Sequence, residues 1–600
     1  MRRKQDRAAR RNTQSQAQTI RRWIGAGLLG AVLVVATMWA GSARVTAADK
    51  ASKDRTPAPA PLPVAFKGRL PITELNEEEA ILHALNRLGY GPRPGDIARV
   101  RQMGLEKWID QQLHPETIDD SALAARLDHY PSIAMSPATL LDQYPTPEVA
   151  AKRMGLTVEA YRKKLEEMAK QRAAGMRVPP EMGPQQVVNE LAMAKLTRAI
   201  YSERQLEEQM TDFWFNHFNV FIYKDADRYL VPSYERDVIR PRALGKFKDL
   251  LSATAHSPAM LIYLDNWLSA DPRAFERIKH LTPPQRRMQA GLPPLGGKRG
   301  LNENYGRELL ELHTVGVDGG YTQKDVIEVA RCFTGWTLRN PQKDPQFYFD
   351  NRLHDPDEKR VMGKKIHAGG IKDGKKVLEM LAKHPSTARF ISLKLARHFV
   401  SDNPPPALVA SIAKTFLKTN ADIRAVLRTM IYSPEFWSRQ TYRAKVKTPF
   451  ELVASTARAL GSDVDAPLTL VQWTARIGEP LYQCLPPTGY ADKAEAWVNT
   501  GALLNRLNFA IALASNRIRG THVELPALVG KDVTADPRAV LGRAIDEFLA
   551  GQVSPETRAT LEQKSMDPQV LRAKLDDPVQ QVDLGILTGL VLGSPEFQRR

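Results

Sequence analysis

Two glutamates near the middle of the chain have the spacing that acid–base chemistry uses. Asn304, Glu308 and Glu311 recur at positions i, i+4 and i+7 of a helix predicted over residues 302–314, so they share one helix face. Two carboxylates one turn apart can share a proton or a divalent cation, and His313 adds a titratable nitrogen near the end of the same helix. Glu308, Glu311 and His313 are therefore candidate catalytic residues.

A histidine in another predicted helix, over residues 203–221, is the fourth catalytic candidate. It belongs to an apolar stripe at helical spacing that is made by Leu206, Met210, Phe213, His217 and Phe221. Two interpretations stay open for His217: the imidazole is a hydrogen-bonded core group, or it acts as a base or ligand that meets the carboxylates. A similar alternative holds for the glutamates, because charges on a helix commonly face solvent or pair with a neighbour such as Arg307.

Polar side chains beside these four residues are candidates for ligand binding: Asn216, Asn302, Asn304 and Arg307. The sequence contains no HExxH motif and no EF-hand loop, so a divalent metal stays a candidate cofactor without an assigned ligand set. The two cysteines, Cys332 and Cys484, are too few for a thiolate zinc site. Serine hydrolase, nucleoside triphosphatase and dinucleotide-binding classes have no support from local motifs, because GxSxG, P-loop and Rossmann patterns are absent from the sequence.

The elements that must position these residues are predicted to be mostly helices. Apolar residues at helical spacing, capping residues and Gly or Pro stops recur along the body, including helices over residues 235–255 and 448–460. Strand-like runs are few and fall near residues 347–349 and 361–366. We therefore expect an all-α, multi-helix globular body with long loops and few short strands.

The N-terminal residues predict export. Arginines and one lysine precede an uncharged run over residues 23–43, which is long enough to span a bilayer, and small residues follow it. Residues 1–47 are thus an export signal or membrane anchor, and 48–72 form a Pro-rich linker. Residues 73–600 form the helical body, with 131–185 as an insertion or mobile subdomain. The body is expected in the periplasm, or facing it from the inner membrane.

The charge of the chain does not indicate nucleic-acid binding. The net charge is +18, but the first 47 residues hold nine basic side chains and one acidic side chain, so nearly half of the surplus lies there. The remaining surplus is scattered along the sequence, which fits a surface near anionic envelope polymers better than a DNA groove.

Long, ordered motifs over nearly all of residues 79–600 resemble an exported bacterial family, the domain of unknown function 1800. They include FWFNHFNV (213–220), GLNENYGRELLELHTVGVDGGYTQKDV (300–326), HPSTARFISLKLARHFVSDNPPP (384–406) and LPPTGYADKAEAW (485–497). The resemblance implies an all-α exported protein. It also implies a candidate partner, the sulfatase-like exported domain of unknown function 1501, because genes of this family often lie next to genes that encode that domain. It also implies that the candidate residues above belong to the family pattern, with Gly306 where that pattern usually has alanine.

Two functions compete on this evidence. The first is an enzyme, such as a hydrolase or metal-assisted activity on an envelope or imported polymer, and it requires the imidazole of His217 and the carboxylates to converge on one cleft. The second is a non-enzymatic helical scaffold that binds the sulfatase-like partner. A scaffold would show an exposed apolar patch of several hundred Å².

Overall fold

The protein was analysed as a computed structural model that describes residues 69–72, 74–174, 176, 182–280, 300–532, 536–571 and 581–600. Helices dominate these residues, and the strands form three separate two-stranded antiparallel pairs. The predicted all-α class is therefore confirmed. The predicted export segment and most of the Pro-rich linker lie outside the described residues.

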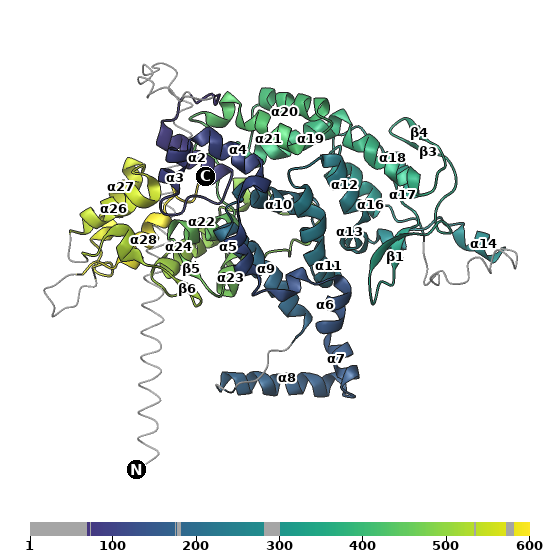
Figure 1. The fold of residues 1–600 in the computed structure, drawn as a ribbon, viewed down its shortest axis with the longest axis horizontal. Coiled ribbons are helices and arrows are strands. Elements are labelled where there is room, and N and C mark those ends of the chain that lie inside the picture. The colour runs from purple at the N-terminus through teal and green to yellow at the C-terminus, as the bar shows by residue number, and fades with distance from the viewer. Residues whose placement is uncertain are drawn as a thin grey trace, which may run out of the picture.

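The first half of the body runs from the N-terminal helices through a projecting pair of helices to the helices that carry the predicted site (Figure 1). Its α-helices are α2 (Glu77–Arg87), α3 (Asp96–Met103), α4 (Leu105–Leu113), α5 (Ser121–Leu127), α6 (Pro137–Gln143), α7 (Pro147–Arg153), α8 (Val158–Ala173), α9 (Pro184–Tyr201), α10 (Gln205–His217), α11 (Asp227–Ser233), α12 (Phe247–His256), α13 (Pro258–Tyr263), α14 (Ala274–Lys279) and α16 (Asn304–Glu308).

The second half continues with helices that cover the top and the opposite end of the body (Figure 1). They are α17 (Gln323–Cys332), α18 (Ile371–Ala382), α19 (Pro385–Phe399), α20 (Pro406–Lys418), α21 (Ile423–Ile431), α22 (Pro449–Ala459), α23 (Leu468–Ile477), α24 (Thr500–Ala514), α25 (Leu525–Val529), α26 (Pro537–Leu549), α27 (Pro555–Ser565) and α28 (Leu584–Leu592).

Strands are short and pair locally. β1 (Trp336–Arg339) pairs with β2 (Gln346–Phe349), β3 (Lys359–Val361) with β4 (Lys364–Ile366), and β5 (Asp463–Val464) with β6 (Thr521–His522). The predicted strand-like runs near 347–349 and 361–366 fall on β2 and on the β3–β4 hairpin.

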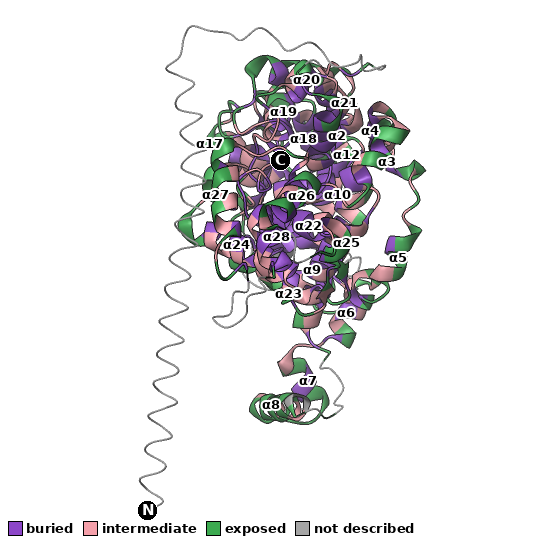
Figure 2. Cartoon of the chain, turned by 90° about the vertical axis from the view of Figure 1, so that its left-hand side faces the viewer, coloured by how far each residue is buried: buried purple, intermediate pink, exposed green. Residues whose placement is uncertain are grey.

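Local sequence explains where several helices start. Asn76 and Glu79 form a reciprocal capping box on α2, and Thr448 and Glu451 form another on α22. The apolar faces then pack into one large hydrophobic core with three small clusters beside it. The most extensive packing between helices is that of α24 on α28 and of α19 on α20. Figure 2 shows this buried interior, with exposed residues on the outer helix faces.

Helices α7 and α8, which we call the arm, lie apart from the packed body in Figures 1 and 2. Both helices fall within residues 131–185, where the sequence predicts an insertion or mobile subdomain. α7 packs against α8, and an ion pair links them, with 3.9 Å between the Nη2 atom of Arg162 in α8 and the Oε1 atom of Glu148 in α7. The domain boundaries themselves stay a prediction.

Three predicted helices differ from the observed ones. The helix predicted over 203–221 ends at His217, so Phe221 lies beyond α10. The prediction of one helix over 235–255 is wrong, because a π-helix (Tyr234–Ile239) and a 3₁₀ turn (Arg240–Arg242) precede α12. Pro241 lacks the backbone N–H that a continuous helix would use, and Lys246, at φ −95° and ψ 131°, is extended and separates the 3₁₀ turn from α12. The predicted helix 302–314 consists of α16 followed by a π-helix over Leu309–His313.

Candidate functional site

The two predicted histidines lie together in the aromatic core. His217 and His313 are each 2% exposed, and the Nε2 atom of His217 lies 3.2 Å from the backbone oxygen of His313. Burial lowers the pKa of His217 well below its ordinary value, and burial together with Lys394 lowers the pKa of His313 to about 3. Both imidazoles are thus neutral at physiological pH, and the rings of Phe213, Phe218 and Phe390 surround them.

The two predicted glutamates occupy a partly exposed polar face of α16 and the π-helix. Burial, then the neighbouring Glu311, raises the pKa of Glu308 to about 6. Glu311 accepts a hydrogen bond of 3.2 Å from the hydroxyl of Tyr321. A carboxyl group with such a pKa can exchange protons near neutral pH, so the acid pair stays a candidate acid–base site.

The predicted ligand-binding residues near this face are engaged with the protein. The side-chain amide of Asn302 donates to the backbone oxygens of Leu264 and Asp265, at 3.2 and 3.0 Å, and its Oδ1 accepts from the backbone N–H of Asn304. Arg307 donates to Gln323 at 2.9 Å. These contacts join α16 to the end of α13 and to the start of α17.

Asn216 has a different partner, the loop over residues 484–490. Its amide donates to the backbone oxygen of Tyr490 at 2.9 Å, and its Oδ1 accepts from the N–H of Tyr490 at 2.7 Å. Asn219 donates to the oxygens of Cys484 and Pro486. Gly489 has φ +71°, and a Cβ atom there would lie 2.2 Å from the backbone oxygen of Asn216. Only glycine therefore fits this close approach.

A small cavity lies beside that loop. Lys195, Asp212 and Glu479 line it, and burial with the nearby Asp212 raises the pKa of Glu479 to about 8. The cavity measures about 50 Å³. This volume holds a few water molecules and is too small for a substrate group of a polymer.

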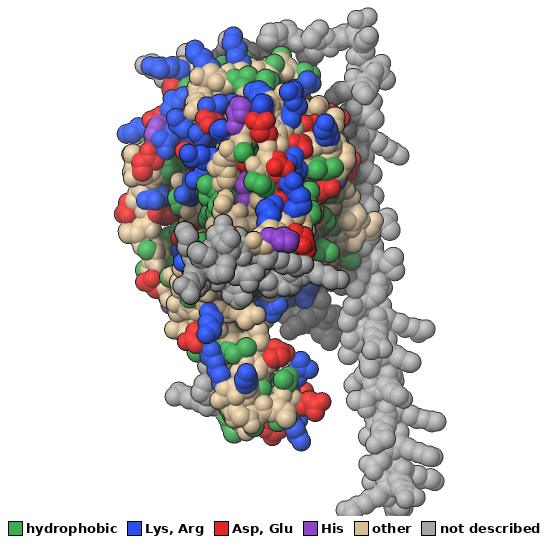
Figure 3. Space-filling view, turned by 90° about the vertical axis from the view of Figure 1, so that its right-hand side faces the viewer, with side chains coloured by type: hydrophobic (Ala, Val, Ile, Leu, Met, Phe, Trp, Pro, Cys, Tyr) green, Lys and Arg blue, Asp and Glu red, His purple; other side chains and the backbone are tan. Residues whose placement is uncertain are grey.

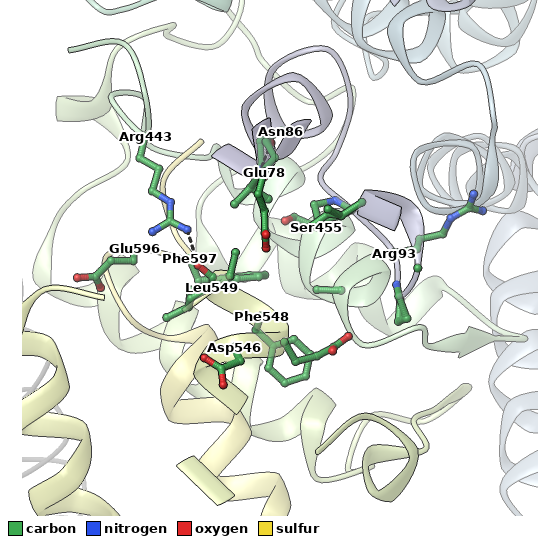
Figure 4. Close-up of a pocket in the computed structure, with 18 of the residues that line it drawn as sticks. Glu78, Asn86, Arg93, Arg443, Ser455, Asp546, Phe548, Leu549, Glu596 and Phe597 are labelled. Carbon is green, nitrogen blue, oxygen red and sulfur yellow. Dashed lines mark hydrogen bonds between the residues drawn. The ribbon is translucent and has the colours of Figure 1, made fainter. Parts of the chain in front are cut away.

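A larger cavity of about 260 Å³ lies between α2, the start of α3, α22, the end of α26 and the C-terminal residues (Figure 4). This volume is close to the lower end of the range for small-molecule sites. Charged side chains of both signs line it, including Arg443 and Glu596, with Ser455 and Phe597 also at its wall.

A nucleophile and a base meet in this larger cavity. The Nζ atom of Lys447 lies 2.7 Å from the Oγ atom of Ser455, and both residues line the cavity while being at most 4% exposed. Lys447 immediately precedes the N-cap of α22, and Ser455 lies two turns into that helix. The lysine backbone is fixed by hydrogen bonds of 2.9 Å to Gln598 and Arg506.

The surroundings lower the pKa of the Lys447 amine enough for the neutral form to be well populated near neutral pH. Burial, and then the guanidinium of Arg443, lowers the pKa of Lys447 from 10.5 to about 7, while Glu451 opposes this shift. The Nζ atom also lies 4.1 Å from the ring centroid of Phe597, which favours the charged form but does not restore the ordinary pKa. A neutral amine at hydrogen-bond distance from a serine hydroxyl is the arrangement of a Ser–Lys nucleophile.

The backbone near Ser455 leaves room at its hydroxyl. Gly91 has φ +90°, and a Cβ there would lie 3.0 Å from the Ser455 Oγ atom. Because Gly91 has no Cβ atom, the space next to the Ser455 Oγ atom stays open on this side. We therefore assign the Ser455–Lys447 pair as the candidate site that the tertiary structure assembles.

Sequence reasoning missed this pair, because its segment KTPFELVAS matches none of the local nucleophile motifs. The only signal was a lysine directly before a predicted helix and a serine on that helix. Within the part of the chain that the structure describes, no three His, Cys, Asp or Glu side chains gather as a metal site would require. Cys332 and Cys484 are free and buried.

Comparison with known families gives one match. The model of a family described as protein of unknown function (DUF1800) matches residues 83–599. No curated protein and no solved structure matches the chain. Among the described residues, no helix is both long and apolar enough to cross a membrane.

Proposed function

The chain belongs to the DUF1800 family of proteins of unknown function, and from this premise we propose that it is an exported hydrolase of ester or amide bonds in an envelope or imported polymer. The N-terminal sequence supports export to the periplasm or to the outer face of the inner membrane. The observation that carries the enzymatic part is the 2.7 Å contact between a buried low-pKa lysine and a serine hydroxyl in one cavity.

The proposed reaction has two steps, acylation of Ser455 and hydrolysis of the acyl-enzyme, and Lys447 accepts and returns one proton in each step. The Ser455 hydroxyl attacks the carbonyl carbon of the substrate and gives its proton to the Lys447 amine. The resulting ammonium returns that proton to the leaving alcohol or amine as the carbon–heteroatom bond breaks. Water then attacks the acyl-enzyme, Lys447 accepts the proton of that water and returns it to the Ser455 oxygen, and a carboxylic acid is released.

A serine-reactive fluorophosphonate tests this proposal directly. Wild-type protein should be labelled at Ser455, and Ser455→Ala and Lys447→Arg should lose labelling, because arginine stays protonated and cannot act as a base. Ser462→Ala is the matched control, since this buried serine lies just beyond α22 and its hydroxyl has no hydrogen-bond partner among the described residues.

A second assay, hydrolysis of an envelope polymer, separates the Ser455–Lys447 pair from the acid pair. If hydrolysis of an envelope polymer is lost in a Glu308→Gln, Glu311→Gln double variant and retained in Ser455→Ala, the reaction belongs to the acid pair and the serine proposal is wrong. Loss in Ser455→Ala with retention in the double variant supports the serine proposal.

A second candidate function, binding of the sulfatase-like exported partner, is favoured by the arm and its flanks. Most of the large apolar side chains that are exposed among the described residues fall between positions 149 and 182: Val149, Met154, Leu156, Met176 and Met182, each 37–53% exposed. Exposed apolar groups clustered on a projecting segment are typical of a protein-binding surface. Co-purification of that partner with wild-type protein, and its loss in a Val149→Lys, Met154→Lys variant, would support this function.

A further inference from the structure

A separate cavity of about 480 Å³ lies between α5, the 3₁₀ turn Pro131–Ala134, α9 and the π-helix Tyr234–Ile239, and we call it the α5–α9 cavity. Its volume is within the range of small-molecule sites. Among the described residues, none lines both this cavity and the cavity that holds Ser455, so the two are different places. π-helical turns occur frequently at functional sites, and this one contributes to the wall.

Most of the wall of the α5–α9 cavity is apolar. Leu127 of α5, Ile133 of the 3₁₀ turn, Leu191 of α9 and Pro232 of α11 line it, together with three alanines. Leu191 and Pro232 are buried, whereas Leu127 and Ile133 are partly exposed. Such a wall favours the hydrocarbon part of a ligand, because contact with it removes apolar surface from water.

One cation in this wall is without a hydrogen bond. Arg198 of α9 donates no side-chain hydrogen bond within the part of the chain that the structure describes, and its Nη1 atom lies 3.9 Å from the Oε1 atom of Glu208. That carboxylate oxygen already accepts a hydrogen bond of 2.6 Å from Arg240. The side chain of Arg198 is 23% exposed, so the cavity gives small solutes access to its guanidinium.

The other arginines and the buried glutamate of the wall have partners within the protein. Arg236 donates to both carboxylate oxygens of Asp237, at 2.8 and 2.6 Å. Glu235 accepts a hydrogen bond of 2.6 Å from the hydroxyl of Tyr482. Among the described residues that line the cavity, Arg198 is therefore the one cation with N–H groups open to a ligand.

The surroundings of Arg198 oppose its positive charge. Burial, and then the neighbouring Arg240, lower the pKa of this guanidinium, and Glu208 offsets the shift only in part. Cations on the outer surface are in a different environment, because Figure 3 shows Lys and Arg side chains facing outward on one side of the molecule, with Asp and Glu side chains among them. A negative charge brought next to Arg198 would relieve the cost of holding this cation in the cavity.

We propose that the α5–α9 cavity binds a small organic monocarboxylate with an apolar body. A guanidinium presents two parallel N–H groups that match the two oxygens of a carboxylate, and the apolar wall accommodates the rest of the molecule. One open guanidinium provides for one negative charge. The exposed Asp128 in the same wall disfavours a ligand with a second one. This binding is independent of the reaction proposed at Ser455.

Fluorine NMR with para-trifluoromethyl phenylacetate as the probe tests the proposal. The full-length protein is used in mild detergent, and protein-free micelles serve as the blank. The corresponding amide, para-trifluoromethyl phenylacetamide, has the same apolar body and no charge. Wild-type protein should broaden the signal of the acid and bind it about tenfold more tightly than the amide, because hydrogen bonds to a charged group are the stronger ones.

Two variants locate the binding. Arg198→Gln should lose the preference for the acid, so that acid and amide bind with the same low affinity, and the fold should persist because Arg240 still pairs with Glu208. Ala124→Phe fills the cavity from an exposed position of α5 and should weaken binding of both ligands at least tenfold.

Arg126→Gln is the control with the same change in net charge as Arg198→Gln. Arg126 is also on α5 but does not line the cavity, so this variant should bind both ligands as wild type does. Equal or absent binding of acid and amide in wild-type protein, or a preference for the acid that persists in Arg198→Gln, would overturn the proposal. Equal weakening in Arg126→Gln would show binding by net charge alone, and wild-type affinity in Ala124→Phe would place the ligand elsewhere; either result also overturns it.

Discussion

Replacing Lys447 by methionine should stabilise the protein while it abolishes the proposed reaction. The wild-type fold holds this amine at a pKa of about 7 instead of 10.5, so at pH 7 folding works against protonation of the lysine. At 1.36 kcal/mol per pKa unit the penalty is roughly 4 to 5 kcal/mol. Methionine has a similar volume and carries no charge into this buried position.

Lost contacts offset part of that gain. The variant forfeits the hydrogen bond to Ser455 and the contact with the Phe597 ring, which together contribute about 2 kcal/mol. A net stabilisation of roughly 2 to 3 kcal/mol at pH 7 remains, and the proposed nucleophile loses its base. This combination of higher stability and lost activity is expected where a buried ionisable group serves function.

The pH dependence of unfolding checks the reasoning. Between about pH 7 and pH 10.5 the unfolded lysine binds a proton that the folded lysine does not, so wild-type stability should rise with pH across this window. Lys447→Met lacks this rise, so its advantage in urea unfolding should shrink as pH increases. An advantage that is independent of pH, or a variant that is less stable than wild type at pH 7, would refute a buried neutral amine.

Three further predictions follow from other parts of the structure. Gly91→Ala should lower fluorophosphonate labelling of Ser455 at least tenfold, because the new methyl group lies 3.0 Å from the nucleophilic oxygen and the backbone has φ +90°; wild-type labelling would contradict the assigned geometry. Asn216→Ala removes two hydrogen bonds to the 484–490 loop and should speed limited proteolysis there, read by mass spectrometry of the fragments, whereas an unchanged rate would mean that other contacts hold the loop. In NMR titration Glu308 should show a raised pKa, and this pKa should fall in Glu311→Gln because the variant removes a neighbouring negative charge. The folded state binds this proton more tightly than the unfolded state, so the contribution of Glu308 to stability is lost as pH rises through about 6. An ordinary pKa of Glu308 in both proteins would exclude the acid pair as a neutral-pH acid.

Much of the fold follows from local sequence. The stripe that includes His217 predicts a buried face of α10, and the histidine is indeed buried. Asn76 and the three glutamates that follow it are residues typical of a helix start, and the capping box of α2 forms there. The interruption before α12 shows the limit of such reasoning, because the apolar spacing over 235–255 reveals neither the missing N–H of Pro241 nor the extended backbone at Lys246.

The chain by itself determined the all-α class, the positions of most helices and the membership of one family. The pairing of Lys447 with Ser455 was decided only by the tertiary structure. Antiparallel pairing of residues 445–447 with the C-terminal residues 598–600 fixes the lysine backbone, and Arg443 and Phe597 complete its surroundings. A pKa near 7 depends on burial and on charges from distant segments, and no local pattern of residue types contains that information.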